Sequence, residues 1–340
     1  MALYAIDDLD DAWVATREFL TPLSARRLLA LAVIVFFVGG SGSGFPGSAS
    51  GTGVPAETDA GVTPSLDALW TVVAENALVI GLVGAAALLV VLAFAFVGAL
   101  MEFVLVESLR TDEVRLRDYS RAFLGEGLRL FGFRIAITAV GLIPALALVG
   151  FGLATAGTGA LTELGGVALV ALALLSVPAF VLLALVDAAT TAFVVPVMLV
   201  RETGVLGAWR AFWPTLAGQW PQYLAYGLVA LLLNVAVGFL FALLLGIVAL
   251  FFLVPFAIIA ASTTLIVSEP IVAAVAVVLG SLFVLFLGIV VLLVQVPVLT
   301  YLRYYALFVL GDTDGGLDPI PEVRRTVREP NERDDAPEPL

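Results

Sequence analysis

The chain has 340 residues, of which 61% are hydrophobic and 13% are charged, whereas soluble domains average about 45–50% apolar and about 25% charged residues. It contains no cysteine and no histidine, and all 16 of its basic residues are arginine. These absences exclude disulfides, thiolate and imidazole metal sites, Ser-His-Asp triads, and lysine-based phosphate-loop or Schiff-base chemistry. The composition therefore predicts a membrane protein that is not an enzyme and that holds no metal and no cofactor.

The formal net charge is −12, so we expect no binding of nucleic acid, which needs a basic surface. Two interpretations of the missing lysine stay open. Either GC-rich codons favour arginine, or the protein belongs to a high-salt cytoplasm in which acidic surfaces are common. Both are typical of haloarchaea, and the composition resembles that of their proteins.

Six apolar runs predict an all-α bundle of about six transmembrane helices, since a helix needs roughly 20 residues to cross about 30 Å of hydrocarbon. The runs cover residues 28–44, 70–108, 130–156, 165–200, 223–253 and 271–310. The first is the weakest of the six. The second, fourth and sixth exceed one crossing at about 1.5 Å per residue, so we expect their second ends to emerge into the cytoplasm as continuous helices.

Arginine placement predicts the orientation of this bundle. Every arginine lies before the first run, between the second and third or at the start of the third, between the fourth and fifth, or at or after the end of the sixth. The positive-inside rule then puts both termini in the cytoplasm of a multi-pass protein of the cell membrane. The aspartates within residues 7–11 and the lack of a cleavage site predict that the first run is retained rather than removed as a signal peptide.

Short segments that combine an aromatic residue with an arginine precede the first, third and fifth runs, at residues 12–22, 118–124 and 208–216. We expect interfacial helices, with apolar side chains in the headgroup boundary and arginine at the phosphates. The expected shared faces are formed by Trp13, Phe19 and Leu20 and by Trp209, Phe212 and Trp213. Two interpretations stay open: three repeats of an interfacial helix plus a hairpin, or ordinary enrichment of these residue types at a membrane border.

The chain is predicted to divide into three parts. Residues 1–27 form a cytoplasmic segment with an interfacial helix, residues 28–310 form the membrane domain, and residues 311–340 form a charged, proline-rich tail that we expect to be disordered. Asp312, Asp314 and Asp318 resemble a calcium loop only faintly, because the closing glutamate is missing at its proper spacing.

Charged and amide side chains inside the apolar runs define the candidate site, because such groups are costly in a bilayer and are functional candidates by default. The cluster comprises Asp187, Glu102, Arg134, Asn234 and Gln295. One interpretation is a cytoplasm-facing cavity that binds an ion, a lipid headgroup or a solute. The other is structural: Glu102 or Asp187 pairs with Arg134, and Asn234 makes an interhelical hydrogen bond.

Three stretches carry a resemblance to a known family: Phe103–Val114, Gly127–Arg134 and Phe193–Phe212. They resemble an uncharacterised haloarchaeal multi-pass membrane family. That family is similar in layout to the membrane domain attached to some glycerophosphodiester phosphodiesterases. The resemblance implies a six-span helical protein without an assigned activity. It implies no catalytic residues, because the catalytic barrel of those phosphodiesterases is absent.

Two function hypotheses follow. The first is a non-enzymatic protein that organises or supports envelope, lipid or membrane-protein processes. The second is a transporter of a small solute or lipid, with the polar cluster in the cytoplasmic half of the bundle as its site. The expected partners are the lipid bilayer and anionic headgroups on the cytoplasmic face, and the sequence does not define an oligomeric state.

Overall fold

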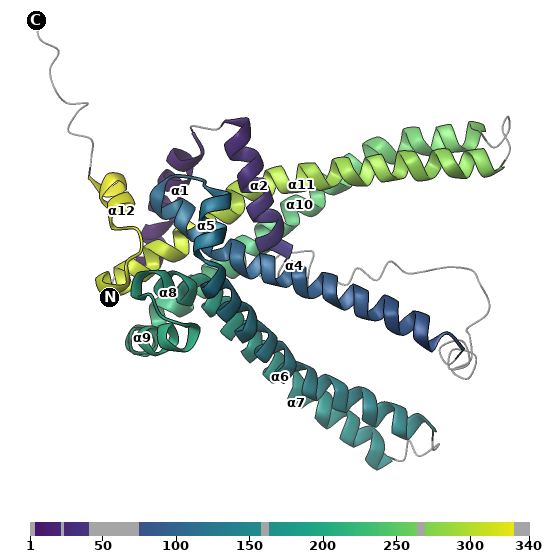
Figure 1. Ribbon diagram of the computed structural model, residues 1–340, viewed down its shortest axis with the longest axis horizontal. Coiled ribbons are helices and arrows are strands. Elements are labelled where there is room, and N and C mark those ends of the chain that lie inside the picture. The colour runs from purple at the N-terminus through teal and green to yellow at the C-terminus, as the bar shows by residue number, and fades with distance from the viewer. Residues whose placement is uncertain (1–3, 22–23, 41–74, 158–162, 264–268, 330–340) are drawn as a thin grey trace, which may run out of the picture.

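The computed structural model describes residues 4–21, 24–40, 75–157, 163–263 and 269–329 (Figure 1). These residues form helices and no strand. The predicted all-α fold is therefore confirmed for the described part of the chain.

Five long helices dominate the structure. The longest three have 35, 44 and 45 residues, or about 52–68 Å at 1.5 Å per residue, well beyond the about 30 Å of a hydrocarbon core. The five helices are α4 (Ala77–Thr111), α6 (Leu124–Gly157), α7 (Glu163–Ala189), α10 (Trp220–Thr263) and α11 (Glu269–Thr313). The lengths of α4 and α11 agree with the prediction that the second and sixth runs exceed one crossing, whereas α10, in the fifth run, is longer than predicted.

The remaining helices are short and lie before, after or between the long ones. They are α1 (Tyr4–Leu20), α2 (Ala25–Gly40), α5 (Leu116–Ala122), α8 (Val195–Arg201), α9 (Val205–Gly218) and α12 (Pro321–Arg328). A π-helical turn, η1 (Thr190–Val194), joins α7 to α8. A 3₁₀ turn, η2 (Gly315–Leu317), joins α11 to α12.

Five helical segments in the described residues are long and apolar enough to cross a membrane, and they correspond to the second to sixth predicted runs. They are Ala77–Thr111, Leu124–Pro144, Ser176–Arg201, Trp220–Phe252 and Val277–Thr313. The first predicted span is not confirmed, because α2 has 16 residues and is only about 24 Å long. Residues 41–74, which follow it, lie outside the described residues.

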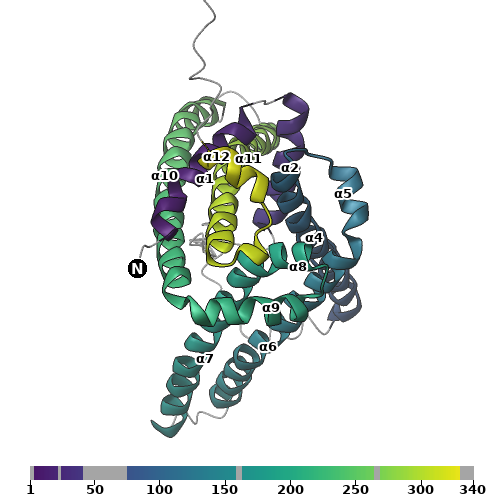
Figure 2. The ribbon, with the colours of Figure 1, turned by 90° about the vertical axis from the view of Figure 1, so that its left-hand side faces the viewer.

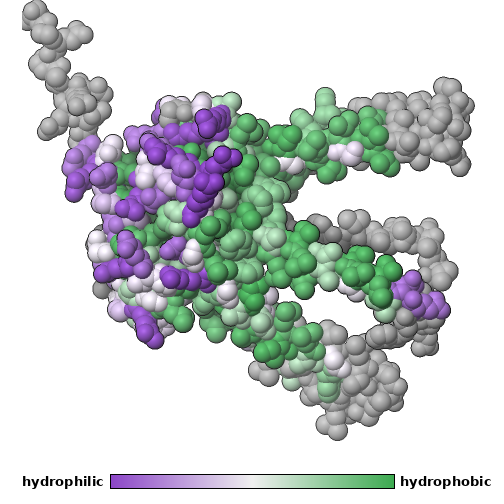
Figure 3. Space-filling view, viewed as in Figure 1, coloured by the Kyte–Doolittle hydropathy of each residue, from purple (hydrophilic) through white to green (hydrophobic). Residues whose placement is uncertain are grey.

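The molecule has a base and three arms. Figure 1 shows α10 with α11, α6 with α7, and α4 diverging from a base that contains the short helices. Hydrophilic residues gather on the base, whereas the described parts of the arms are almost entirely hydrophobic (Figure 3). Helices that are apolar on every exposed face suit a lipid environment.

The C-terminal end of α11 is the centre of the base. Eight consecutive residues, 303–310, are buried there, so this stretch is enclosed on all faces of the helix. Viewed from the base end, the other base helices surround it (Figure 2). Tyr304 packs edge-on against Phe19 of α1 at 6.1 Å between ring centroids, and its hydroxyl donates to the Leu109 carbonyl of α4 at 3.1 Å. This segment therefore connects the N-terminal helix with the first long helix.

The predicted aromatic faces of the interfacial helices are wrong. Phe19 is buried, whereas Trp13 on the same helix is 62% exposed. Phe212 is fully buried, whereas Trp213 is 60% exposed. The reason is helical geometry: residues six apart, or adjacent, point in different directions at about 100° per residue. In α1 and α9 the phenylalanine anchors the helix to the base, and the tryptophan points outward.

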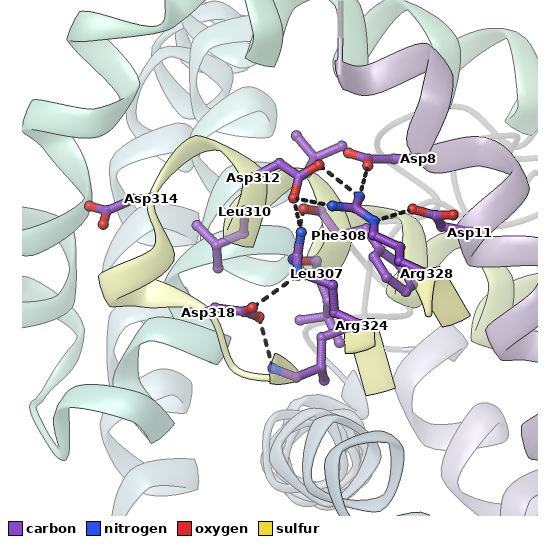
Figure 4. Close-up of polar contacts among 12 residues, drawn as sticks. Asp8, Asp11, Leu307, Phe308, Leu310, Asp312, Asp314, Asp318, Arg324 and Arg328 are labelled. Carbon is purple, nitrogen blue, oxygen red and sulfur yellow. Dashed lines mark hydrogen bonds and ion pairs between the residues drawn. The ribbon is translucent and has the colours of Figure 1, made fainter. Parts of the chain in front are cut away.

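The prediction of a disordered tail from Gly311 is wrong for residues 311–329, which are described as the end of α11, η2 and α12. Ion pairs hold α12, together with the partly buried Val323 and Val327, which pack against the core. Arg324 binds Asp312 and Asp318, and its Nη2 donates to the Phe308 carbonyl at 3.0 Å (Figure 4). A Cβ at Gly311 would overlap the Arg324 guanidinium, so the glycine lets that side chain lie on α11.

Arg328 attaches α12 to the N-terminal helix. It binds Asp8 at 3.0 Å and Asp11 at 2.6 Å on α1, and Asp312 at 2.8 Å at the end of α11 (Figure 4). Residues more than 300 positions apart in the chain thus meet in one cluster. Sequence composition alone indicates disorder for such a segment because the stabilising carboxylates belong to distant helices.

Asp8 is the most perturbed acid of this cluster. Its side chain is fully buried, and burial raises its pKa from 3.8 to about 6, although Arg328 opposes the shift. Burial also lowers the pKa of Arg324 to about 10. Ionisation of Asp8 therefore costs folding free energy through the lost hydration of its carboxylate, although Arg328 and Arg324 of α12 favour the ionised form.

Shortening a side chain at the centre of the base should destabilise the fold far more than shortening a side chain on an arm. Leu307 is fully buried and Leu89 is 68% exposed, so we expect Leu307→Ala to destabilise the fold by about 2–5 kcal/mol through lost transfer energy and a cavity. We expect the same change at Leu89 to cost well under about 1 kcal/mol. Unfolding in mixed detergent–SDS micelles, followed by tryptophan fluorescence, measures both. Equal losses of unfolding free energy in the two variants would contradict the assignment of the α11 end as the centre of the base.

The stability of the base around α1 should depend on pH through Asp8. Because burial raises the folded-state pKa of Asp8 from 3.8 to about 6, its stabilising contribution is complete below about pH 4 and disappears as the pH rises through about 6. Hydrogen exchange of the α1 amides, corrected for intrinsic rates, should therefore show more protection at pH 5.5 than at pH 7.5. Asp8→Asn should remove this difference, and an unchanged difference in that variant would rule out Asp8 as its source.

Candidate functional site

A buried ion cluster has Glu102 at its centre. This residue lies on α4 ten positions before Asp112, which caps the helix, and its side chain is fully buried. One carboxylate oxygen, Oε2, pairs with Nη2 of Arg303 on α11, and the other, Oε1, pairs with Nη2 of Arg134 on α6 at 3.3 Å. A single carboxylate thus joins three of the five long helices.

Arg134 extends the cluster to α7 and the π-helical turn. Its Nε donates to Asp187 Oδ1 at 3.3 Å, and its Nη2 donates to Thr191 Oγ1 at 2.8 Å. The Asp187 side chain is 25% exposed, so it forms the outer edge of the cluster. The predicted pairing of Glu102 and Asp187 with Arg134 is present in the structure.

A proline lies directly after the π-helical turn and explains why one carbonyl of the turn has no backbone amide to bind. Within the turn the Val195 amide donates to the Thr190 carbonyl, five residues earlier. In the same register the Thr191 carbonyl would receive the amide of residue 196, but Pro196 has no N–H. Arg303 Nη1 donates to this carbonyl at 2.5 Å. The arginine therefore satisfies a backbone acceptor that would be costly to leave unpaired in a buried site.

The turn is also connected to the base through its first residue. Thr190 Oγ1 donates to the Val186 carbonyl at 2.6 Å and accepts from Trp209 Nε1 of α9 at 3.1 Å. Phe193 in the same turn stacks on Phe212 of α9 at 5.4 Å between centroids. The π-helical turn is thus held by side chains of α6, α9 and α11.

Two predicted members do not join the cluster through any ion pair or hydrogen bond in the described residues. Asn234 donates to the Ala230 carbonyl of its own helix at 2.7 Å, not to a neighbouring helix. Gln295 is buried on α11, and its Oε1 has no hydrogen-bond partner among the described atoms. The sequence gave no information on which way either side chain faces.

Arg303 and Thr191 are essential members that sequence reasoning did not include in the site. Arg303 was counted with the cytoplasmic arginines that follow the sixth run. The missed signal was its context, since Tyr301–Leu310 is apolar apart from Arg303 and thus favours a buried helix. An arginine within such a stretch needs a buried partner.

The cluster is electrically balanced and suited to holding helices together. Its two arginines and two carboxylates carry no net charge, and their side chains are between 0 and 25% exposed. Arg134 Nη1 and Arg303 Nε are buried donors without a partner in the described structure. Guanidinium groups stay protonated near neutral pH, so they serve as fixed positive charges rather than as proton-transfer groups.

No group of carboxylates in the described residues is arranged to hold a metal ion. In the segment that resembled a calcium loop, Asp312 binds Arg324 and Arg328. Asp314 accepts hydrogen bonds from Thr215 at 3.0 Å and from the Gly316 amide at 2.9 Å. Arginine, threonine and backbone donors thus occupy the oxygens that a cation would need.

Comparison with known proteins identifies the family. Residues 3–320 match a family of unknown function, DUF7544. The chain belongs to this family. No curated protein and no solved structure matches it.

The family match agrees with the predicted membership of an uncharacterised family. The haloarchaeal origin and the layout resembling phosphodiesterase membrane domains stay predictions. The five apolar helices are compatible with a multi-pass membrane protein.

Neutralising the central carboxylate should strongly destabilise the base. Glu102→Gln leaves the buried Arg303 without a counter-charge and leaves Arg134 with Asp187 alone, so we expect a loss of about 3–5 kcal/mol. Glu107→Gln is the matched control on the same helix, because Glu107 forms only a 3.5 Å pair with the half-exposed Arg110, a type worth about 0–1 kcal/mol. The same detergent–SDS unfolding measures both variants. If Glu102→Gln were as mild as Glu107→Gln, the pairing would not stabilise the base.

Proposed function

We propose that this DUF7544 protein is a non-enzymatic multi-pass protein of the cell membrane that organises lipids or other membrane proteins. Its base lies on the cytoplasmic side with both termini, and its arms lie in the bilayer. The observation that carries the proposal is the separation of a polar, ion-paired base from three apolar arms that diverge from it (Figures 1 and 3).

The exposure of the arms supports an organising role. In the most hydrophobic windows of α4, α10 and α11, no residue is buried within the chain. On α4, Leu82, Leu89 and Val90 are each more than 60% exposed. Lipid tails or helices of other membrane proteins are the environments in which such surfaces are stable.

The placement of arginine and tryptophan supports the proposed orientation. The positive-inside rule assigns the arginine-rich base to the cytoplasm. Trp13, Trp213 and Trp220 are each at least 60% exposed on the base or at its border with an arm. Exposed tryptophan at one level along a membrane protein is typical of the headgroup boundary.

The proposal includes three related units, each an amphipathic helix followed by a hairpin. Asp112 and Glu202, which end the second helices of the first two units, are the two non-glycine residues with positive φ in the described chain, at 54° and 50°. Glu102 precedes Asp112 by ten residues, and Thr191 precedes Glu202 by eleven. The π-helical turn accounts for the additional residue. The ion cluster thus joins corresponding positions of the proposed units.

A transporter is the second candidate, and one observation favours it. A π-helical turn next to a buried arginine with an unpaired donor, Arg134 Nη1, is the kind of irregularity that often marks a site. The close pairing of the cluster argues for the structural role, because both Glu102 oxygens are engaged.

Single-cysteine labelling tests the orientation, since the parent chain has no cysteine. Glu75 and Thr326 are exposed and lie at the start of α4 and on α12. We expect a membrane-impermeant maleimide to label Glu75→Cys in intact cells and Thr326→Cys only after the cells are opened. The reverse pattern would invert the proposed orientation.

Reconstitution in liposomes separates the two functions. The organising proposal predicts no proton flux and no scrambling of a fluorescent lipid above empty vesicles, for the natural chain and for Asp187→Asn alike. Flux that Asp187→Asn removes without loss of folding would establish the transporter. Asn234→Ala is a control on another apolar helix, because the Asn234 side chain donates to the Ala230 carbonyl of its own helix and has no hydrogen bond to the cluster in the described structure.

A further inference from the structure

We propose that α1, α5 and α9 form a three-point surface that binds the phosphate groups of anionic phospholipids. The inference rests on the proposed membrane function and names its lipid partner. It follows from arginines that are left unpaired, from the apolar residues beside them, and from the distribution of the three helices around the base.

The arginines of these helices differ from those inside the base. Arg17 on α1, Arg117 and Arg121 on α5, and Arg210 on α9 are exposed, and none makes an ion pair with a described residue. By contrast, the arginines that join helices are bound to carboxylates; these are Arg27, Arg134, Arg303, Arg324 and Arg328. The chain carries a net charge of −12, so these cations are unpaired even though acidic residues are in excess.

Each helix places its arginine beside an exposed apolar side chain. Trp13 and Arg17 are four residues apart on α1, as are Leu206 and Arg210 on α9, and residues at this spacing share a face. Trp13 is 62% exposed and Leu206 68% exposed. An arginine whose neighbour on the same face is apolar suits the boundary between acyl chains and phosphates.

The α5 region repeats this pattern with two arginines. Arg117 and Arg121 are four residues apart, and Leu124 and Leu128 follow at the start of α6 with 48% and 59% exposure. The helix has no buried residue. Packing within the chain thus leaves this surface uncovered.

The three helices lie on different sides of the base. Figure 2 shows α1, α5 and α9 distributed around the end of α11 and α12. Such an arrangement contacts several lipid molecules around the protein rather than one ligand in a pocket. Guanidinium groups bind phosphate oxygens in a bidentate manner, and the flanking apolar side chains favour a phosphate attached to acyl chains over free phosphate.

Tryptophan quenching by brominated lipid tests the proposal on the full chain. The protein is reconstituted into vesicles in which one tenth of the lipid carries bromine, either on phosphatidylglycerol or on phosphatidylcholine, in otherwise identical mixtures. We expect at least about twofold more quenching from the brominated anionic lipid at 0.1 M salt, where the Debye length is about 10 Å. The excess should shrink at 1 M salt, where that length is about 3 Å.

Variants assign the effect to the three helices. In the combined Arg17→Gln, Arg121→Gln and Arg210→Gln variant, the two brominated lipids should quench the tryptophan fluorescence equally. Arg325→Gln is the control, because Arg325 is equally exposed but lies on α12, at the end of the base away from the arms (Figure 1); it should keep the excess. Equal quenching of the natural chain by both lipids, or an excess that survives the combined variant, would overturn the proposal. Absence of quenching by either lipid would instead contradict the membrane function itself.

Discussion

The structure depends on one buried arginine, which lies in an otherwise apolar segment near the C-terminal end of α11. Arg303 begins the fully enclosed segment 303–310 of α11 and is itself buried. Its charge is balanced by Glu102 of α4, and a second donor occupies the Thr191 carbonyl that Pro196 leaves free. Burial of an unpaired guanidinium would cost several kcal/mol. The three arms can therefore meet at the base only when α4, the π-helical turn η1 and α11 are correctly positioned relative to one another.

This constraint explains the contrast between the base and the arms. In the base, side chains from distant parts of the chain close around α11, as when Arg328 of α12 reaches Asp8 and Asp11 of α1. In the arms, apolar residues are exposed and the helices diverge (Figure 1). Lipid does not drive apolar helices together, whereas a buried polar cluster in an apolar setting selects one arrangement. The base thus fixes the geometry, and the arms present apolar surfaces.

The sequence indicated the parts of this account that depend on local composition. Run length predicted five of the spans, and charges within apolar runs identified Glu102, Arg134 and Asp187 as a pairing group. It did not indicate contacts between distant segments. Arg303 was assigned to the cytoplasmic side because the run before it already satisfied a membrane crossing. Residues 321–328 were expected to be disordered because the tail is charged and proline-rich, and two of the carboxylates that bind Arg328, those of Asp8 and Asp11, lie at the other end of the chain. The prediction that Trp13 and Phe19 share one face was wrong, because aromatic character alone does not distinguish a buried side chain from one that points outward.

A double-mutant cycle on Glu102 and Arg303 tests the central claim most directly. Glu102→Gln, Arg303→Gln and the combined variant are compared by the free energy of unfolding in detergent–SDS micelles. If the pair positions α4 against α11, the two changes are strongly non-additive, with a coupling energy of about 2 kcal/mol or more, because the second change removes a charge that the first left unpaired. Losses that add to within about 0.5 kcal/mol would show that the two residues act independently and would contradict the account.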